Sequence, residues 1–135
     1  MKIVFDTNCL FRVLPQNSPY RCYGTHFYAM SLSYGYTTEI LQEYEEVLTR
    51  FYTPIIAEFT VETLIKSLNT IQVIPWYKWN LITADPDDNK FVDCALNAGA
   101  DLIVTNDKHF NVLKDIDFPK VNVVDIDTFK RIISM

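Results

Sequence analysis

The chain has 135 residues, 49% of them apolar and 14% aromatic, so its length fits a single domain, residues 1–135, with one hydrophobic core. Twelve basic and seventeen acidic residues give a net charge of −5, which argues against a protein held on nucleic acid by its overall field. An acidic pocket that binds cations remains compatible with this charge, because bound cations reverse the local potential.

Cysteine usage and hydropathy indicate the compartment. Cys9, Cys22 and Cys94 show no CxxC spacing, so we expect neither a disulfide framework nor a zinc site. The apolar stretch before Asp6 is too short for a signal peptide, and the uncharged stretch 22–38 contains glycines and polar residues that make it a poor membrane span. We therefore expect a cytoplasmic protein without membrane contact.

The first predicted element is a strand, Lys2–Phe5, a short apolar run that ends at Asp6. A helix over about residues 19–34 is expected to end at Gly35, and a weak strand signal follows at Tyr36–Thr37.

The clearest helix comes next, because apolar residues recur at i, i+3 and i+4. Its apolar stripe consists of Ile40, Leu41, Tyr44, Val47, Leu48 and Phe51. Thr53 followed by Pro54 offers a cap and a first position for another helix that reaches Leu68, and a break near Thr60 is one interpretation of its pattern.

Three further apolar runs predict strands at Ile71–Ile74, Leu102–Thr105 and Val121–Val124. A helix that starts at Asp85–Pro86 and ends at Gly99 separates the first two, and a last helix starts near Asp125. Strands separated by helices predict an α/β fold whose parallel sheet, of four or five strands, is covered on both faces.

Two carboxylates follow predicted strands directly. In an open parallel sheet, ligands bind beyond the carboxyl ends of the strands. Asp6 follows the first strand, and Asp107 follows the strand that ends at Thr105. For each residue alone, capping of the next turn is an equally good interpretation.

Asp88 falls on the same helical arc as Phe91 and Val92, whereas Asp93 points away from that arc. A carboxylate on an apolar arc needs a partner. It either binds a ligand or, three residues after the cap Asp85, stabilises the positive end of the helix.

Two glutamates on the clearest helix are also candidates. Glu43 and Glu45 flank the apolar stripe on opposite sides, while Glu39 and Glu46 lie away from it. Periodicity therefore leaves both flanking residues open, and a solvated border position explains either one.

Four segments, in this order, resemble the PIN-domain nucleases. They are Asp6-Thr7-Asn8, the helix that contains Glu43, Asp85-Pro86-Asp87-Asp88, and Thr105-Asn106-Asp107. The chain most resembles the small bacterial and archaeal members described as toxin components of toxin–antitoxin systems, and the similarity covers nearly its whole length. The resemblance implies a three-layer α/β/α PIN-like fold. Asn106 departs from the family, whose members usually have a small residue such as glycine there, and this bears on the shape of the loop.

The resemblance also implies an active site for RNA hydrolysis. Its metal ligands would be Asp6, Glu43, Asp88 and Asp107, which hold one or two Mg²⁺ or Mn²⁺ ions. Glu43 is thereby preferred to Glu45, while Asp87 stays an alternative to Asp88. Thr7, Asn8 and Thr105 would orient the carboxylates or bound water. Metal-activated water would attack phosphorus and leave 5′-phosphate and 3′-hydroxyl ends.

Partners follow from the same resemblance, which implies an RNA substrate and an antitoxin protein. Arg12, Lys90 and Lys108 are candidate contacts for the RNA backbone. We also expect a homodimer. Aromatic residues crowd positions 20–36, where they would pack in a dimer, against an antitoxin segment or in the core.

Three other functions are alternatives. A non-catalytic PIN-like module that binds RNA or protein is the main alternative, and the presence of all four acids argues against it. A haloacid-dehalogenase-like phosphatase would need a second aspartate where Asn8 stands. His26 and His109 are the only pair for a two-histidine nuclease, and we expect His109 to be a surface residue.

Overall fold

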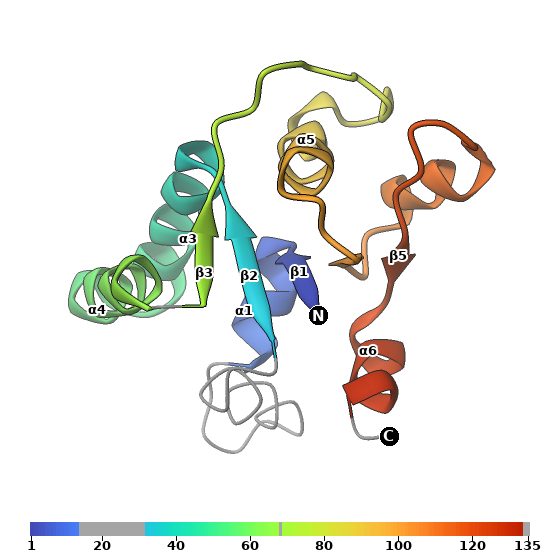
Figure 1. Ribbon diagram of the computed structural model, residues 1–135. Helices are drawn as coiled ribbons and strands as arrows, with labels where there is room; N and C mark the ends of the chain where they lie inside the picture. The colour runs from blue at the N-terminus through green and yellow to red at the C-terminus, as the bar shows by residue number, and fades with distance from the viewer. Residues whose placement is uncertain (14–31, 68, 134–135) are drawn as a thin grey trace.

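A computed structural model describes residues 1–13, 32–67 and 69–133 of the chain (Figure 1). Within these residues, five strands form one parallel sheet in the order β3-β2-β1-β4-β5. The strands are β1 (Lys2–Phe5), β2 (Ser33–Tyr36), β3 (Thr70–Gln72), β4 (Leu102–Val104) and β5 (Val123–Val124). The predicted α/β class, with a parallel sheet of four or five strands, is confirmed.

Helices follow most of the strands. The α-helices are α1 (Thr7–Val13), α3 (Thr38–Phe51), α4 (Pro54–Lys66), α5 (Asn89–Ala98) and α6 (Ile126–Ile133). Two 3₁₀ helices, η1 (Pro86–Asp88) and η2 (Lys108–Asp115), lie before α5 and after β4. In the described part of the chain, none of the helices has the length and apolar character needed to cross a bilayer.

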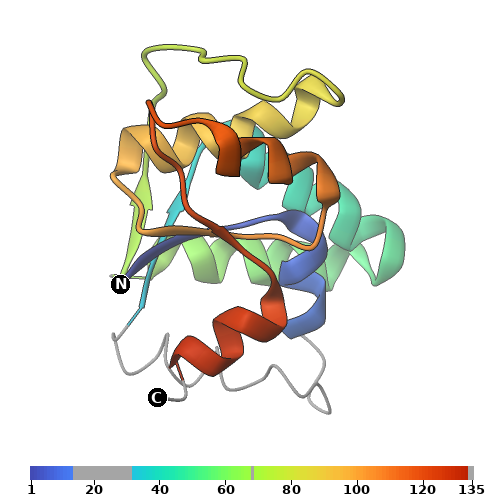
Figure 2. The same cartoon turned by 90° about the vertical axis from the view of Figure 1, so that its right-hand side faces the viewer.

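The sheet is covered on both faces, and the side chains of β1 alternate between them as pleating requires. Ile3 and Phe5 belong to the core under α6, where the rings of Phe5 and Phe129 meet edge to face at 6.0 Å. Val4, between them, belongs to the core under α5. Figure 2 shows α5 and η2 on one side of the sheet and α6 on the other, which gives the three layers.

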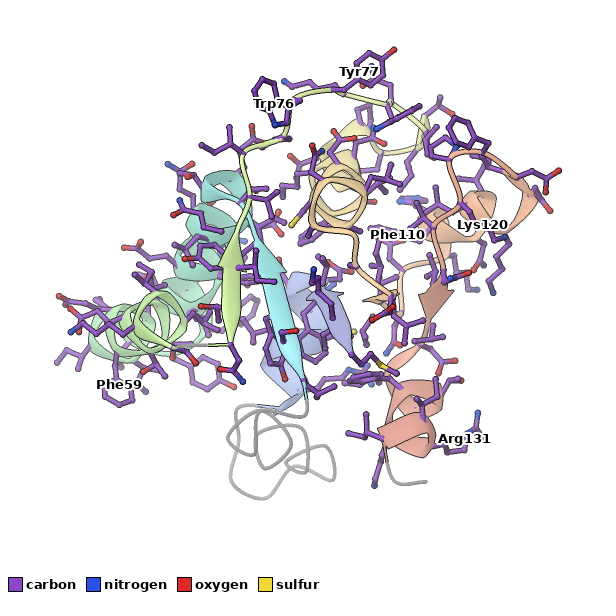
Figure 3. The ribbon with its side chains drawn as sticks, in the orientation of Figure 1. Phe59, Trp76, Tyr77, Phe110, Lys120 and Arg131 are labelled. Carbon is purple, nitrogen blue, oxygen red and sulfur yellow. The ribbon has the colours of Figure 1, made fainter. Side chains whose placement is uncertain are left out.

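The core under α5 is closed by the 3₁₀ helix after β4. Phe110 of η2 lies 6.3 Å, centroid to centroid, from Phe91 of α5, and both side chains are buried. Figure 3 shows Phe110 turned to the interior, whereas Trp76 and Tyr77, on the loop after β3, point outward. The sequence pattern did not predict η2 or α1, because both are short and begin with polar residues.

β2 corrects the prediction of a helix over residues 19–34. Residues 33 and 34 are strand, and residues 19–31 lie outside the described part of the chain. Gly35 lies within β2, where an added Cβ would stand 3.3 Å from the Cβ of Ala98. Glycine at this position therefore serves the close packing of β2 against α5 and does not end a helix.

α4 begins as predicted, because the Thr53 hydroxyl accepts the Ile56 N–H at 3.2 Å and Pro54 takes the first position. The break suggested near Thr60 is wrong. Thr60 stays helical because its hydroxyl donates to the Ile56 carbonyl at 2.8 Å, so its polar group is satisfied within the helix.

The η1–α5 segment also begins and ends as predicted. Asp85 caps η1 by accepting the Asp87 N–H at 3.3 Å, and Gly99 ends α5 with φ of 65°. Asp93 lies on the side of α5 away from the apolar arc, yet it is buried. Its carboxylate accepts the N–H of Trp79 at 3.2 Å, because the long loop between β3 and η1 covers this side of the helix.

Asn89 ties that loop to α5. Its buried side chain accepts the N–H of Ile82 at 2.9 Å and donates to the carbonyl of the same residue at 2.8 Å. The Asn89 side chain thus bonds both backbone groups of Ile82, as a neighbouring strand would, and holds the chain in place just before Asp85.

Replacing Asn89 by Ala should destabilise the fold by about 2 to 4 kcal/mol, because both buried backbone groups of Ile82 lose their partner. Urea unfolding of the purified protein measures this free energy. Asn111→Ala, at an exposed position of η2, is the matched control. A loss for Asn89→Ala no larger than that of the control would contradict the bridging role.

Candidate metal centre at the carboxyl edge of the sheet

The centre of the candidate site is built by the pairing of β1 with β4. Phe5 stands opposite Val104 in the register, so Asp6 and Thr105 leave the sheet side by side although 99 residues separate them. The Thr105 hydroxyl donates to Asp6 Oδ2 at 2.6 Å, and the Asp6 N–H donates to the Val104 carbonyl at 3.0 Å. Asp6 is thereby held, almost fully buried, at the exit of β1.

α3 contributes Glu43. The Tyr44 hydroxyl donates to the Phe5 carbonyl and holds this helix against the end of β1. As a result, Glu43 faces the site and accepts a hydrogen bond from Thr7, whereas Glu45 is exposed. Packing of α3 decides between the two glutamates that periodicity left open.

Asp88 comes from the junction of η1 and α5. It holds the N-cap position of α5, yet its side chain makes no capping hydrogen bond, so the capping interpretation does not account for its carboxylate. Asp87 is largely exposed, and its carboxylate binds Lys90 at 2.8 Å. Asp88, by contrast, is influenced by the charges of Asp107, Asp85 and Asp6.

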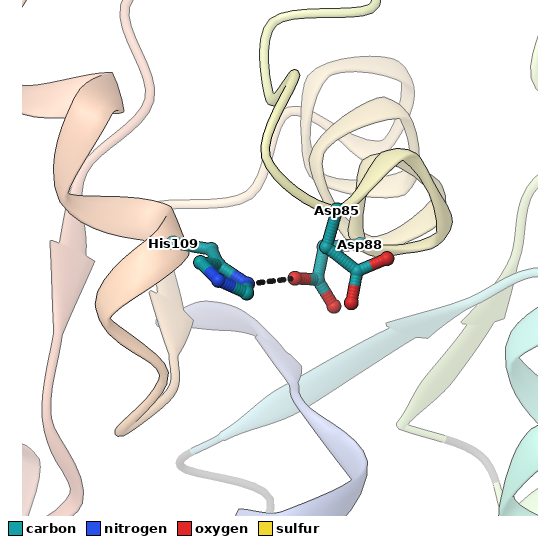
Figure 4. Close-up of side chains that lie close together, drawn as sticks. All are labelled: Asp85, Asp88 and His109. Carbon is teal, nitrogen blue, oxygen red and sulfur yellow. Dashed lines mark hydrogen bonds and ion pairs between the residues drawn. The ribbon is translucent and has the colours of Figure 1, made fainter.

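Asp107 and His109 complete the group on the β4 side. Asp107 caps η2 by accepting the His109 N–H at 2.9 Å. In this turn the His109 ring lies beside both acids. Its Nδ1 is 3.4 Å from Asp88 Oδ2 and 3.4 Å from Asp107 Oδ1. Among the described residues, one donor atom each of Asp85, Asp88 and His109 lie within 4.8 Å of one another, a group that can hold a metal ion (Figure 4).

Sequence reasoning missed Asp85 and His109 as members of this group. Asp85 was interpreted only as a cap, and His109 as a surface residue. The available signal was the position of His109 two residues after Asp107, because an aspartate that caps a turn accepts the N–H of just that residue.

Crowding of carboxylates raises their proton affinity. Burial raises the pKa of Asp88 to about 6, and the charges of Asp107 and Asp85 add to this effect. Burial also raises the pKa of Asp6, although the hydrogen bond from Thr105 acts in the opposite direction. A cation would relieve this repulsion and favour the charged carboxylates.

The polar companions lie close to the acids. Thr7 and Thr105 each donate to a carboxylate, as described above. Asn8 is exposed and lines a cavity of about 410 Å³ together with Arg12, Asn106 and Asp107. Asn106 also accepts the N–H of Ile126 at 3.0 Å, so the residue that departs from the family pattern anchors the start of α6.

The two lysines predicted to contact RNA differ in environment. Lys108 is exposed at the start of η2. The Lys90 side chain is only 9% exposed and lies 2.7 Å from Glu43 Oε1. Lys90 is thus a counter-ion within the acidic group.

The donor set, which consists of carboxylate oxygens and one imidazole, is suited to a divalent cation. The cysteines of the described chain do not contribute. Cys9 and Cys94 are buried, and burial raises the pKa of each thiol to about 12, which leaves them protonated.

The family model of the PIN domain matches residues 2–109. The chain belongs to the PIN domain family, and the resemblance to that family is confirmed. The comparison with curated proteins found no match.

Solved structures share the fold at low sequence identity. A chain of VapBC2 from Rickettsia felis bound to a promoter DNA fragment has a TM-score of 0.64 at 15% identity, over 93% of this chain and 98% of that one. VapBC-1 from nontypeable Haemophilus influenzae has a TM-score of 0.64 at 13% sequence identity, and the match covers 94% of this chain and 99% of that one. DNA-bound VapBC from Salmonella typhimurium has a TM-score of 0.58 at 19% sequence identity, and the match covers 93% of this chain and 98% of that one. The three-layer α/β/α PIN-like architecture is confirmed.

The raised pKa of Asp88 predicts a pH-dependent cost in metal-free protein. The pKa of Asp88 is 3.8 in the unfolded chain and about 6 in the folded protein. Between these two pH values the folded protein keeps a proton that the unfolded chain has released, so the contribution of Asp88 to the free energy of unfolding falls as pH rises. In EDTA, the Tm of Asp88→Asn minus that of the wild type should therefore increase from about pH 4 to about pH 7. Mg²⁺ at the higher pH should reduce the difference. A difference that is constant with pH would contradict the assignment.

Proposed function

We propose that this PIN domain, residues 1–135, is an endoribonuclease that depends on Mg²⁺ or Mn²⁺ and serves as the toxin of a toxin–antitoxin system. The observation that carries the proposal is the convergence of carboxylates at one sheet edge, on a fold of the PIN family. The proposed metal site is formed by the acids Asp6, Glu43, Asp88 and Asp107, and Asp85 and His109 group with Asp88.

When bound, Mg²⁺ or Mn²⁺ lowers the pKa of its water and neutralises the charge of a phosphodiester. The chain itself supplies orientation. Thr105 and Thr7 donate to Asp6 and Glu43 and so keep the carboxylates turned to the site. Arg12 and Lys108, on either side of Asp107 at the sheet edge, are the proposed contacts for the RNA backbone.

Asp6→Asn and Asp88→Asn should each reduce metal-dependent RNA cleavage by about 100-fold or more, because metal-ion catalysis supplies several kcal/mol of transition-state stabilisation. Purified protein is incubated with single-stranded and structured RNAs in Mg²⁺, Mn²⁺ or EDTA. Asp117→Asn, at an exposed position, serves as control. RNA binding without metal and without cleavage, unaffected by Asp6→Asn, would instead support a non-catalytic PIN-like module.

The antitoxin partner is supported by an exposed apolar surface on α4. Of its thirteen residues only Ala57 is buried, while Ile55 and Phe59 are 79% and 71% exposed. Figure 3 shows Phe59 pointing outward from α4. Large apolar side chains gathered on one helix mark a protein interface, and the structural neighbours are themselves VapBC complexes. We propose that an antitoxin covers α4. The homodimer remains a prediction.

Production of the chain in a bacterial host should arrest growth, and Asp6→Asn should not. If a small open reading frame lies beside its gene, co-production of the encoded protein, the expected antitoxin, should restore growth. The double variant Ile55→Ser, Phe59→Ser should abolish this rescue without weakening the arrest, because it removes apolar contact area far from the acids. Rescue that survives the double variant would exclude α4 as the antitoxin surface.

A further inference from the structure

Lys90 places a fixed positive charge inside the acidic group. Its Nζ lies 2.7 Å from Glu43 Oε1 and 2.8 Å from Asp87 Oδ2, and 5.5 Å from the centroid of the Phe91 ring. The side chain is 9% exposed, so most of the water around its ammonium has been replaced by carboxylates and an aromatic face. Such a lysine is part of the site's architecture and not a solvated surface charge.

Glu43 is fully engaged by protein donors. Lys90 binds its Oε1, and the Thr7 hydroxyl donates to its Oε2. A divalent ion on either oxygen would lie close to the ammonium, and the two like charges would repel each other in this partly buried site. Glu43 therefore has little capacity to bind a metal ion while Lys90 is present.

The other side of the group is organised differently. Asp88 makes no capping hydrogen bond, and its contact with His109 is long, at 3.4 Å. Donor atoms of Asp85, Asp88 and His109 converge within 4.8 Å. The charges of Asp107, Asp85 and Asp6 act on Asp88. Glu43 is thus held by the Lys90 ammonium, whereas Asp88 belongs to a group of side chains that can hold a cation.

We propose that the Lys90 ammonium, bound to Glu43, occupies the place of a second metal ion. The site therefore binds a single divalent ion, on the side of Asp88 and Asp107. The inference rests on the proposed metal-dependent function. In two-metal sites the second ion supplies positive charge opposite the first, and here the lysine ammonium supplies it permanently. Lys90 is a positioning residue, which holds Glu43 and neutralises its charge whether or not metal is bound.

The test counts Mn²⁺ ions bound per chain, by the EPR signal of free Mn²⁺ during titration of the full chain. The wild type should bind one ion. Lys90→Met keeps an unbranched apolar side chain but removes the charge, and should bind a second ion. The double variant Lys90→Met, Glu43→Gln should return to one. Lys90→Arg, the matched control, keeps the charge and should also bind one ion.

Two ions, or none, on the wild type would overturn the inference, and so would a single ion on a folded Lys90→Met. If thermal melting shows that Lys90→Met does not fold, the wild type and Lys90→Arg decide, since two ions on either would refute it. RNA cleavage by the same samples separates the two proposals. Cleavage with two bound ions contradicts only the role of Lys90, and one bound ion without cleavage contradicts only the nuclease.

Discussion

The pairing of β1 with β4 is the constraint on which the site depends. It brings Asp6, at the start of the chain, beside Thr105, and it aligns the exits of both strands. β1 is the central strand of five, between β2 and β4, and Tyr44 of α3 bonds to its last residue, Phe5. Acids carried by elements far apart in sequence meet here because parallel strands all end at one edge of the sheet.

Gathering acids at that edge has an energetic cost, which the surrounding residues offset. Burial and mutual repulsion raise the pKa values of Asp6 and Asp88, so the site disfavours its own charged state. Hydroxyl donors and the ammonium of Lys90 reduce this cost on the side of Glu43. On the Asp88 side, the proposed cation would offset this cost, and its binding would then be linked to the stability of the fold.

Much of the fold could be predicted from local patterns. β1 has the predicted bounds. The start of α4, the start of η1 and the end of α5 follow from Thr53-Pro54, Asp85-Pro86 and Gly99, because caps depend on residues within one turn. β2 was placed too late because an aromatic-rich strand with an internal glycine, Gly35, resembles a helix end in sequence. Its identity as a strand depends on pairing with β1 and on packing under α5.

The sequence by itself determined the class of fold, the order of its elements and the acids that leave the strands, since hydrophobic period and capping are properties of neighbouring residues. Only the tertiary structure decided which side chains meet. Glu43 and Glu45 have equivalent places beside the stripe of α3, and the contact of Tyr44 with Phe5 turns Glu43 inward. The inclusion of His109 and Lys90 in the acidic group depends likewise on contacts between distant elements, because periodicity defines the face of a helix but not what packs against it.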